Sequence, residues 1–101
     1  DAKVAVAEAE LGVAKAELGV AKAEFAKAHQ RGDQVTIADA KVAVAEAELG
    51  VAKAELAKAH QRGDQVTIAD AKAAVAKQEV AVAKQEVAVA NAKAAVADPG
   101  Q

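Results

Sequence analysis

The sequence predicts an all-α fold, an antiparallel three-helix bundle or array that runs up, down and up, and three observations predict it. Residues 39–69 restate residues 1–38 almost letter for letter with one seven-residue block fewer, and a looser third copy starts at Asp70. The bulky apolar residues recur every seven positions, and most other residues are Ala, Lys and Glu, which favour helices. Because the loss of a whole heptad leaves each side chain on its own helical face, we expect equivalent helices in a single domain, residues 1–101.

The first predicted helix spans about residues 2–31. Alanine-rich heptads run through it without a proline, and Gly32 stands where a C-cap glycine belongs. His29 and Arg31 precede this glycine, and positive charge is favourable at a helix C-terminus. The first helix is therefore expected to end at a turn that begins with Gly32.

The second predicted helix spans about residues 37–62 and the third about residues 68–97. A Thr-x-x-Asp capping box, Thr36 to Asp39, starts the second helix, and the same letters start the third. The third helix is expected to stop at Asp98-Pro99-Gly100. Connections of about four residues favour antiparallel neighbours.

Two apolar faces run along the predicted helices. With Val4 assigned to heptad position a, positions a and d of the first helix form the a/d face: Val4, Ala7, Leu11, Ala14, Leu18, Ala21 and Phe25. Positions b, c and f form the b/c/f face: Ala5, Val6, Ala9, Gly12, Val13, Ala16, Gly19, Val20 and Ala23. Charged residues at positions e and g separate the two faces, so the helix has two sides able to pack against a neighbour.

The b/c/f face is the predicted functional surface. A closed three-helix bundle needs one apolar face from each helix, so a second face calls for another helix, another molecule or an ordered surface. We expect it to mediate self-association into a homo-oligomer or filament. The candidate interface lies on the first two helices: Val6, Gly12, Val13, Ala16, Gly19, Val20, Ala23, Val44, Gly50, Val51 and Ala54. The third helix carries Gln78 and Gln85 at position f and is expected to turn this face to solvent.

Glycines inside the helices support close packing of this face. Gly12, Gly19 and Gly50 each cost about 1 kcal/mol relative to alanine in an exposed helix. Each lies four residues before an alanine, a spacing that lets two backbones approach closely. The alternative is that duplication copied a tolerated glycine.

Composition argues against most chemistry and several partners. The net charge is -2 with Lys and Glu interleaved, so there is no basic stripe for nucleic acid. Charged residues interrupt every apolar stretch before the roughly 20 residues that a membrane span needs. The chain has no Cys, Ser or Tyr, which leaves only threonines and lysines as nucleophiles. We expect no enzyme, no cofactor, no nucleic-acid partner and no membrane span.

Two short motifs invite functional interpretations. His29 and His60 end successive antiparallel helices about 40 Å long, so no shared metal site is expected. The tripeptide Arg-Gly-Asp, which integrins bind on exposed loops, occurs in both turns: Arg31, Gly32, Asp33, Arg62, Gly63 and Asp64. Each letter also has a structural role, as C-terminal charge, cap and turn. Integrin-type adhesion is an alternative to self-association.

The regular b/c/f face is also compatible with binding to an ordered surface. A flat, regular helical surface of Ala, Val and Gly resembles that of type I antifreeze proteins, which implies ice binding. The regularly spaced threonines of that family are missing here, since Thr36 and Thr67 are both expected to cap helices. A monomeric scaffold without a ligand is the third alternative to self-association.

The turn AKAHQRGDQVTIADAK and the segment AVAKQEVAVAKQEVAVANAKAAVA resemble the alanine-rich α-hairpins of bacterial periplasmic adaptor (membrane-fusion) proteins. The resemblance implies an antiparallel coiled-coil hairpin, here without that family's lipoyl and β-barrel domains. The near-perfect repeats are equally similar to a consensus-built or designed helical-hairpin repeat.

Overall fold

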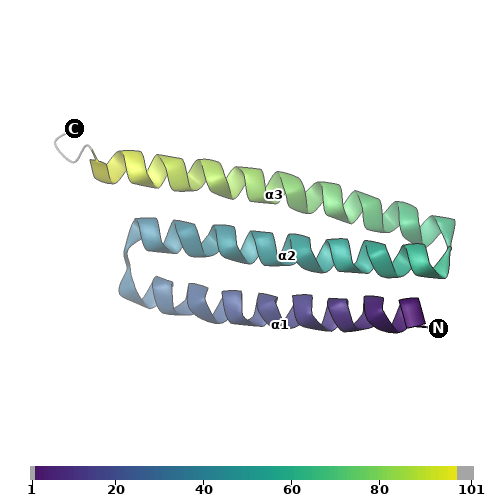
Figure 1. The fold of residues 1–101 in the computed structure, drawn as a ribbon. Coiled ribbons are helices and arrows are strands. Elements are labelled where there is room, and N and C mark those ends of the chain that lie inside the picture. Colours follow the sequence, from purple (N-terminus) through teal and green to yellow (C-terminus); the bar gives the residue numbers. More distant parts are fainter. Residues whose placement is uncertain (1, 98–101) are drawn as a thin grey trace.

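The computed structural model of the chain describes residues 2–97. Within this range it contains three helices, α1 (Ala2–Arg31), α2 (Gln34–Arg62) and α3 (Gln65–Ala97), and no strand. The helices lie side by side with α2 in the middle (Figure 1). The predicted all-α, up-down-up array is therefore confirmed, whereas the predicted stop at Asp98-Pro99-Gly100 lies outside the described residues.

Turns of two residues connect the helices, which is shorter than the sequence suggested. Gly32 adopts the left-handed conformation with φ 76°, and its N–H donates to the carbonyl of Ala28 at 3.2 Å. Gly63 repeats this geometry with φ 77° and a 3.0 Å bond to the carbonyl of Ala59. The predicted C-cap glycines thus end their helices, because a residue without Cβ takes this backbone conformation without strain.

The next helix begins three residues earlier than expected, at Gln34, because Asp33 is its N-cap. Asp33 has an extended backbone, φ -79° and ψ 116°, and its Oδ1 accepts the N–H of Val35 at 3.2 Å. The hydroxyl of Thr36 donates to Asp33 Oδ2 at 2.6 Å instead of capping the helix itself. The predicted Thr36 capping box is therefore wrong. Asp33 directly follows the left-handed Gly32, so its carboxylate lies beside the free N–H groups at the start of α2.

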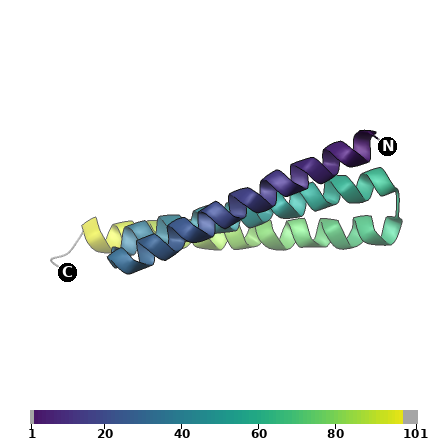
Figure 2. The same ribbon diagram turned by 90° about the horizontal axis from the view of Figure 1, so that it is seen from below.

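The three helices form one layer and not a closed bundle. Within residues 2–97, α2 packs against both neighbours, and no Cα of α1 lies within 8 Å of a Cα of α3. The molecule measures 60 × 23 × 13 Å, and α1 crosses the other two helices obliquely (Figure 2). Its radius of gyration, 16.8 Å, exceeds the roughly 12.7 Å typical of a compact domain of this length. One face of each outer helix is consequently uncovered.

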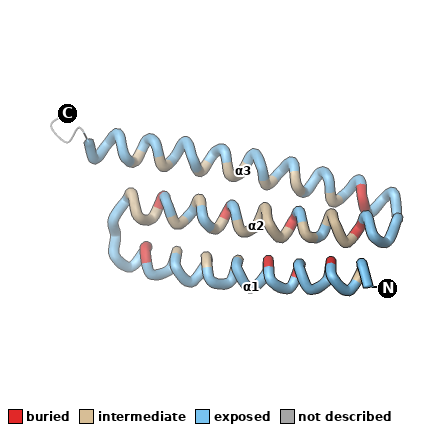
Figure 3. The backbone as a smooth tube through the Cα atoms, in the orientation of Figure 1, coloured by how far each residue is buried: buried red, intermediate tan, exposed pale blue. Residues whose placement is uncertain are grey.

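The core is thin because it consists mainly of alanine. On α1 the buried turns lie on the side that faces α2 (Figure 3). The buried residues are Ala7, Leu11, Ala14, Ala28, Ala38, Ala45, Ala52, Ala59 and Ile68. Alanine allows close helix packing but buries little apolar area. The chain accordingly exposes 6525 Å², compared with about 5300 Å² for a typical monomer of this mass.

Candidate functional site

The central helix uses both of its apolar faces inside the molecule. Towards α3 it turns its a/d face, since the buried Ala52 and Ala59 line the groove between α2 and α3. Towards α1 it turns its b/c/f face, since Gly50 and Ala54 line the groove between α1 and α2. The charged position e, occupied by Lys53 among others, is exposed between the two faces. Each face of α2 is thus covered by a different neighbour.

The same pairing of faces occurs at both helix contacts. On α1 the buried Ala7, Leu11 and Ala14 belong to the a/d face, so this face packs on the b/c/f face of α2. The a/d face of α2 in turn packs on the b/c/f face of α3, which contributes the buried Ile68 and the half-buried Ala71. Every contact between helices in the array therefore joins an a/d face to the b/c/f face of the helix that follows.

On α3 the sequence interpretation chose the wrong face for solvent. Gln78 and Gln85 are half-buried on the side that packs against α2, together with Val75, Val82 and Val89. Gln85 lines a hollow with Val44 of α2 and Phe25 of α1. A glutamine has an apolar stem and no charge, so it tolerates the edge of a thin alanine core. The exposed face of α3 is its a/d face.

The predicted interface residues of α1 lie on the side opposite its buried a/d face, and Val6 and Val13 among them also line the groove between α1 and α2. The valines at position c are the bulkiest members, and Val13 is 60% exposed. All predicted members on α1 are exposed: Val6, Gly12, Val13, Ala16, Gly19, Val20 and Ala23. The predicted members on α2 are half-buried on the side towards α1: Val44, Gly50, Val51 and Ala54. Of the predicted interface, only the part on α1 is thus uncovered.

A second uncovered apolar surface, the a/d face of α3, was not identified from the sequence. Val80 and Val87 are 55% and 60% exposed, and Val66 on the same line is 70% exposed. A sequence signal for it existed, because α3 carries valine at positions a and c alike. Which of these two rows faces inward depends on the order of helices in the array.

The glycines make no close backbone contact in this molecule. A Cβ built on Gly12, Gly19 or Gly50 would meet nothing within 4 Å. The expectation that they permit touching backbones is therefore wrong for the contacts of a single copy. At Gly50 the groove between α1 and α2 is open, with a volume of about 570 Å³.

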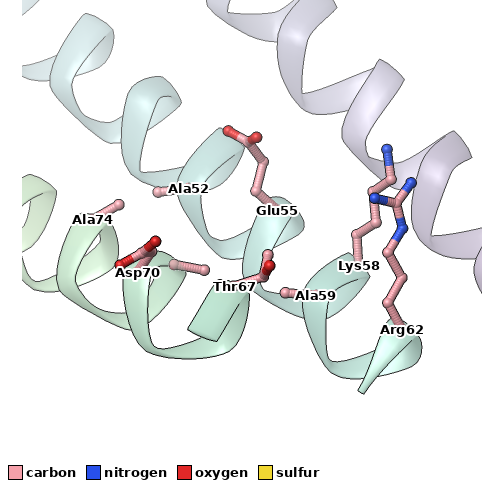
Figure 4. A pocket seen from close by; sticks show the side chains of 9 residues that line it. Ala52, Glu55, Lys58, Ala59, Arg62, Thr67, Asp70 and Ala74 are labelled. Atoms are coloured by element: carbon pink, nitrogen blue, oxygen red, sulfur yellow. The ribbon is translucent and has the colours of Figure 1, made fainter. Parts of the chain in front are cut away.

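The hollow next to the second turn is the most polar of the described grooves. It has a volume of about 320 Å³ and lies between α2 and α3 (Figure 4). Thr67 and Asp70 of α3 face Ala52 and Ala59 of α2, while Lys58 and Arg62 extend away from them. Thr67 already donates to Asp64 Oδ2 at 2.6 Å, and no other hydroxyl lines the hollow. The one hydroxyl of this hollow therefore supports the turn before α3.

Both Arg-Gly-Asp turns use their aspartate for structure. The side-chain hydrogen bond from Thr36 is the main cause that lowers the pKa of Asp33 below 3.8, with help from the backbone of Val35 and against desolvation. Thr67 and then the backbone of Val66 lower the pKa of Asp64 in the same way. Both carboxylate oxygens thus accept hydrogen bonds within the chain, so the capping role accounts for the aspartate of each turn.

The histidines lie at the two ends of the array, where α1 and α2 finish (Figure 1). His29 contacts Phe25 with ring centroids 5.8 Å apart. Across residues 2–97 no group of three or more His, Cys, Asp or Glu side chains has the arrangement of a metal site. None of the three described helices has a stretch apolar and long enough to span a membrane.

Comparison with known protein families, curated proteins and solved structures finds no match for this chain.

Proposed function

We propose that this protein is a non-catalytic structural module that self-associates through the b/c/f face of α1. The observation that supports the proposal most strongly is the exposure of that face. Val6, Val13 and Val20 are 57%, 60% and 63% exposed in a row along one side of the molecule. Contiguous apolar surface of this kind typically marks an interaction site on a soluble protein.

The composition of the face suits a protein partner. No charged residue occurs at positions b, c and f between Ala5 and Ala26, whereas charges line both of its edges. An uncharged centre with a polar rim is the usual anatomy of a protein interface. The b/c/f face of α1 also has the same sequence as the b/c/f face of α2, which packs against α1.

Light scattering against concentration tests the proposal, with refractive index as detector because the chain lacks Trp and Tyr. We expect the mass of the unaltered protein to rise above 10.1 kDa with concentration. The variant Val13→Lys with Val20→Lys should stay at 10.1 kDa and keep its helicity, because lysine is a good helix former at an exposed site.

A matched control separates the effect of the face from that of net charge. Glu8→Gln with Glu46→Gln raises the net charge by the same two units at exposed e positions. This control should assemble like the unaltered protein. An unaltered protein that remains at 10.1 kDa at every concentration overturns the proposal.

A further inference from the structure

Two apolar faces of the array are uncovered, the b/c/f face of α1 and the a/d face of α3. Inside the array, each helix contact joins one face of each of these two kinds. We propose that copies associate head to tail, with the a/d face of α3 in one copy packed on the b/c/f face of α1 in the next. The inference rests on the proposed self-association and names the surface that meets α1. Its occupant is a second copy of this chain.

The first argument comes from two segments of identical sequence, one around each turn. A further helix covers the start of α2 in the first segment, and within the described residues none covers the start of α3 in the second. Residues 26–41 and 57–72 have the same sequence. Ala38 in the first is 8% exposed under α3, whereas its equivalent Ala69 is exposed. Val35 is half-buried, whereas its equivalent Val66 is 70% exposed. What α3 lacks on this side is the next helix.

The outer face of α1 supplies the complementary comparison. Val13 is 60% exposed, whereas its equivalent Val51, on the side of α2 that faces α1, is half-buried. Gly12 is exposed, whereas its equivalent Gly50 is half-buried in the groove beside α1. What α1 lacks on this side is the preceding helix. An α3 from another copy would occupy the place that α1 occupies beside α2.

The a/d face of α3 has the chemistry that this place requires. In α1 and α2 this face presents bulky apolar residues at position a and alanine at position d. In α3 it presents a similar uncharged row: Val66, Ala69, Ala73, Ala76, Val80, Ala83, Val87, Ala90 and Ala94. Neither this row of α3 nor positions b, c and f of α1 between Ala5 and Ala26 contain a lysine or a glutamate, so the desolvation cost is small. The helix lengths also match, since α1 has 30 residues and α3 has 33.

A contact of this type is heterologous, because two different surfaces meet. Each added copy leaves one α1 face and one α3 face free again, so growth continues unless the ring closes. The single-layer fold already works in this way, since each helix contacts only its neighbours in the row. Pairing of α1 with α1 would place two b/c/f faces together, a combination that neither helix contact in the described array uses.

Complementation between two blocked variants tests the inference. The first variant, Val13→Lys with Val20→Lys, blocks the face of α1. The second, Val80→Lys with Val87→Lys, blocks the face of α3, at sites that are 55% and 60% exposed and therefore tolerate lysine. Each variant alone should remain at 10.1 kDa. An equimolar mixture should form a 1:1 complex of twice 10.1 kDa, because each variant supplies the face that the other lacks.

The possible results separate this inference from the proposed function. If the unaltered protein never exceeds 10.1 kDa, self-association itself fails. If the unaltered protein assembles and the variant blocked on α3 still dimerises, α1 pairs with α1 and the head-to-tail inference is overturned. A mixture that stays monomeric while the unaltered protein assembles overturns it as well. Circular dichroism of both variants checks that the helices are intact.

Discussion

At the scale of single residues, the turns decide where each helix begins. Asp33 and Thr36 are both favourable N-cap residues, so sequence preference alone does not choose between them. Asp33 is the N-cap because it directly follows Gly32, whose left-handed backbone ends α1. The hydroxyl of Thr36 then donates a 2.6 Å hydrogen bond to the Asp33 carboxylate. In the second turn, the carboxylate of Asp64 likewise accepts hydrogen bonds from the N–H of Val66 and the hydroxyl of Thr67.

The capping aspartates give the stability of the fold a defined pH dependence. Their pKa is lowered from 3.8 by hydrogen bonds that exist only in the folded chain. A lowered folded pKa contributes stability that is fully present above pH 3.8 and is lost as the pH falls through the folded value. We expect Asp33→Asn with Asp64→Asn to lose this part of the acid dependence, while the amide oxygens keep some of the capping.

Thermal unfolding followed by far-ultraviolet circular dichroism checks this expectation. The difference in unfolding midpoint between the original chain and the double variant should be constant near neutral pH and shrink below pH 3.8. A Thr36→Val with Thr67→Val control should raise the pKa of both aspartates towards 3.8, since it removes the largest cause of the shift. A midpoint difference that does not change with pH would contradict the assignment of these caps.

Substitution by alanine should have opposite effects on stability at the glycines inside the helices and at the glycines that end them. Gly12→Ala and Gly19→Ala should each stabilise the monomer by about 1 kcal/mol, since a Cβ meets nothing within 4 Å and alanine is the better helix former. Gly32→Ala should destabilise, because φ 76° is strained for a residue with Cβ. Denaturant unfolding of the variant Val80→Lys with Val87→Lys, which we expect to be monomeric, measures both effects without interference from the proposed assembly. Destabilisation by Gly12→Ala in this variant would contradict the open surroundings of that glycine.

At the scale of elements, the side that each helix turns inward follows from its place in the row. α1 turns its a/d face inward and α3 its b/c/f face, although both carry related sequences. Valines at two positions of the heptad make either face of α3 suitable as a core, so the amino-acid pattern does not determine its rotation. The contact with the a/d face of α2 determines it.

A pair of valines two residues apart tests the rotation of α3. Val82 is half-buried towards α2, and Val80 is 55% exposed. Val82→Lys should lower the free energy of unfolding by about 1 to 2 kcal/mol, because a charged group replaces part of a thin apolar contact. Val80→Lys should change it by less than about 0.5 kcal/mol. Chemical denaturation at low protein concentration compares them, and the reverse ranking would mean that α3 packs with its other face.

Some features of these helices could be predicted from the sequence and others could not. The number of helices and the cap glycines follow from heptads and turn chemistry alone. The face that α1 turns inward does not follow, because its a/d and b/c/f faces are both apolar. The cap at Asp33 does not follow, because the length of the turn is a property of the packed hairpin. The role of Val44 and Val51 does not follow either, because only the flat arrangement gives α2 a neighbour on each side. Identical two-faced repeats are the signal that favours an open row over a closed bundle.

At the scale of the whole molecule, stability is a sum of contacts between neighbours. Since no Cα of α1 lies within 8 Å of a Cα of α3 across residues 2–97, we expect either outer helix to detach from α2 by breaking mainly one interface, whereas α2 unfolds only when both are lost. A closed bundle of three mutually packed helices would not have this gradient. The order of the helices in the row therefore sets the order of their local stabilities.

Native-state hydrogen exchange makes this gradient measurable. In the variant Val80→Lys with Val87→Lys, which should be monomeric, we expect amides of α2 to exchange most slowly and those of α1 and α3 to exchange faster. Leu11→Ala, which opens a hole in the contact of α1 with α2, should accelerate exchange in α1 and leave α3 unchanged, because within residues 2–97 no Cα of α1 lies within 8 Å of one in α3. Equal protection in all three helices would contradict an open array. If the original chain assembles head to tail as proposed, each outer helix gains a second neighbour, and its protection should rise towards that of α2.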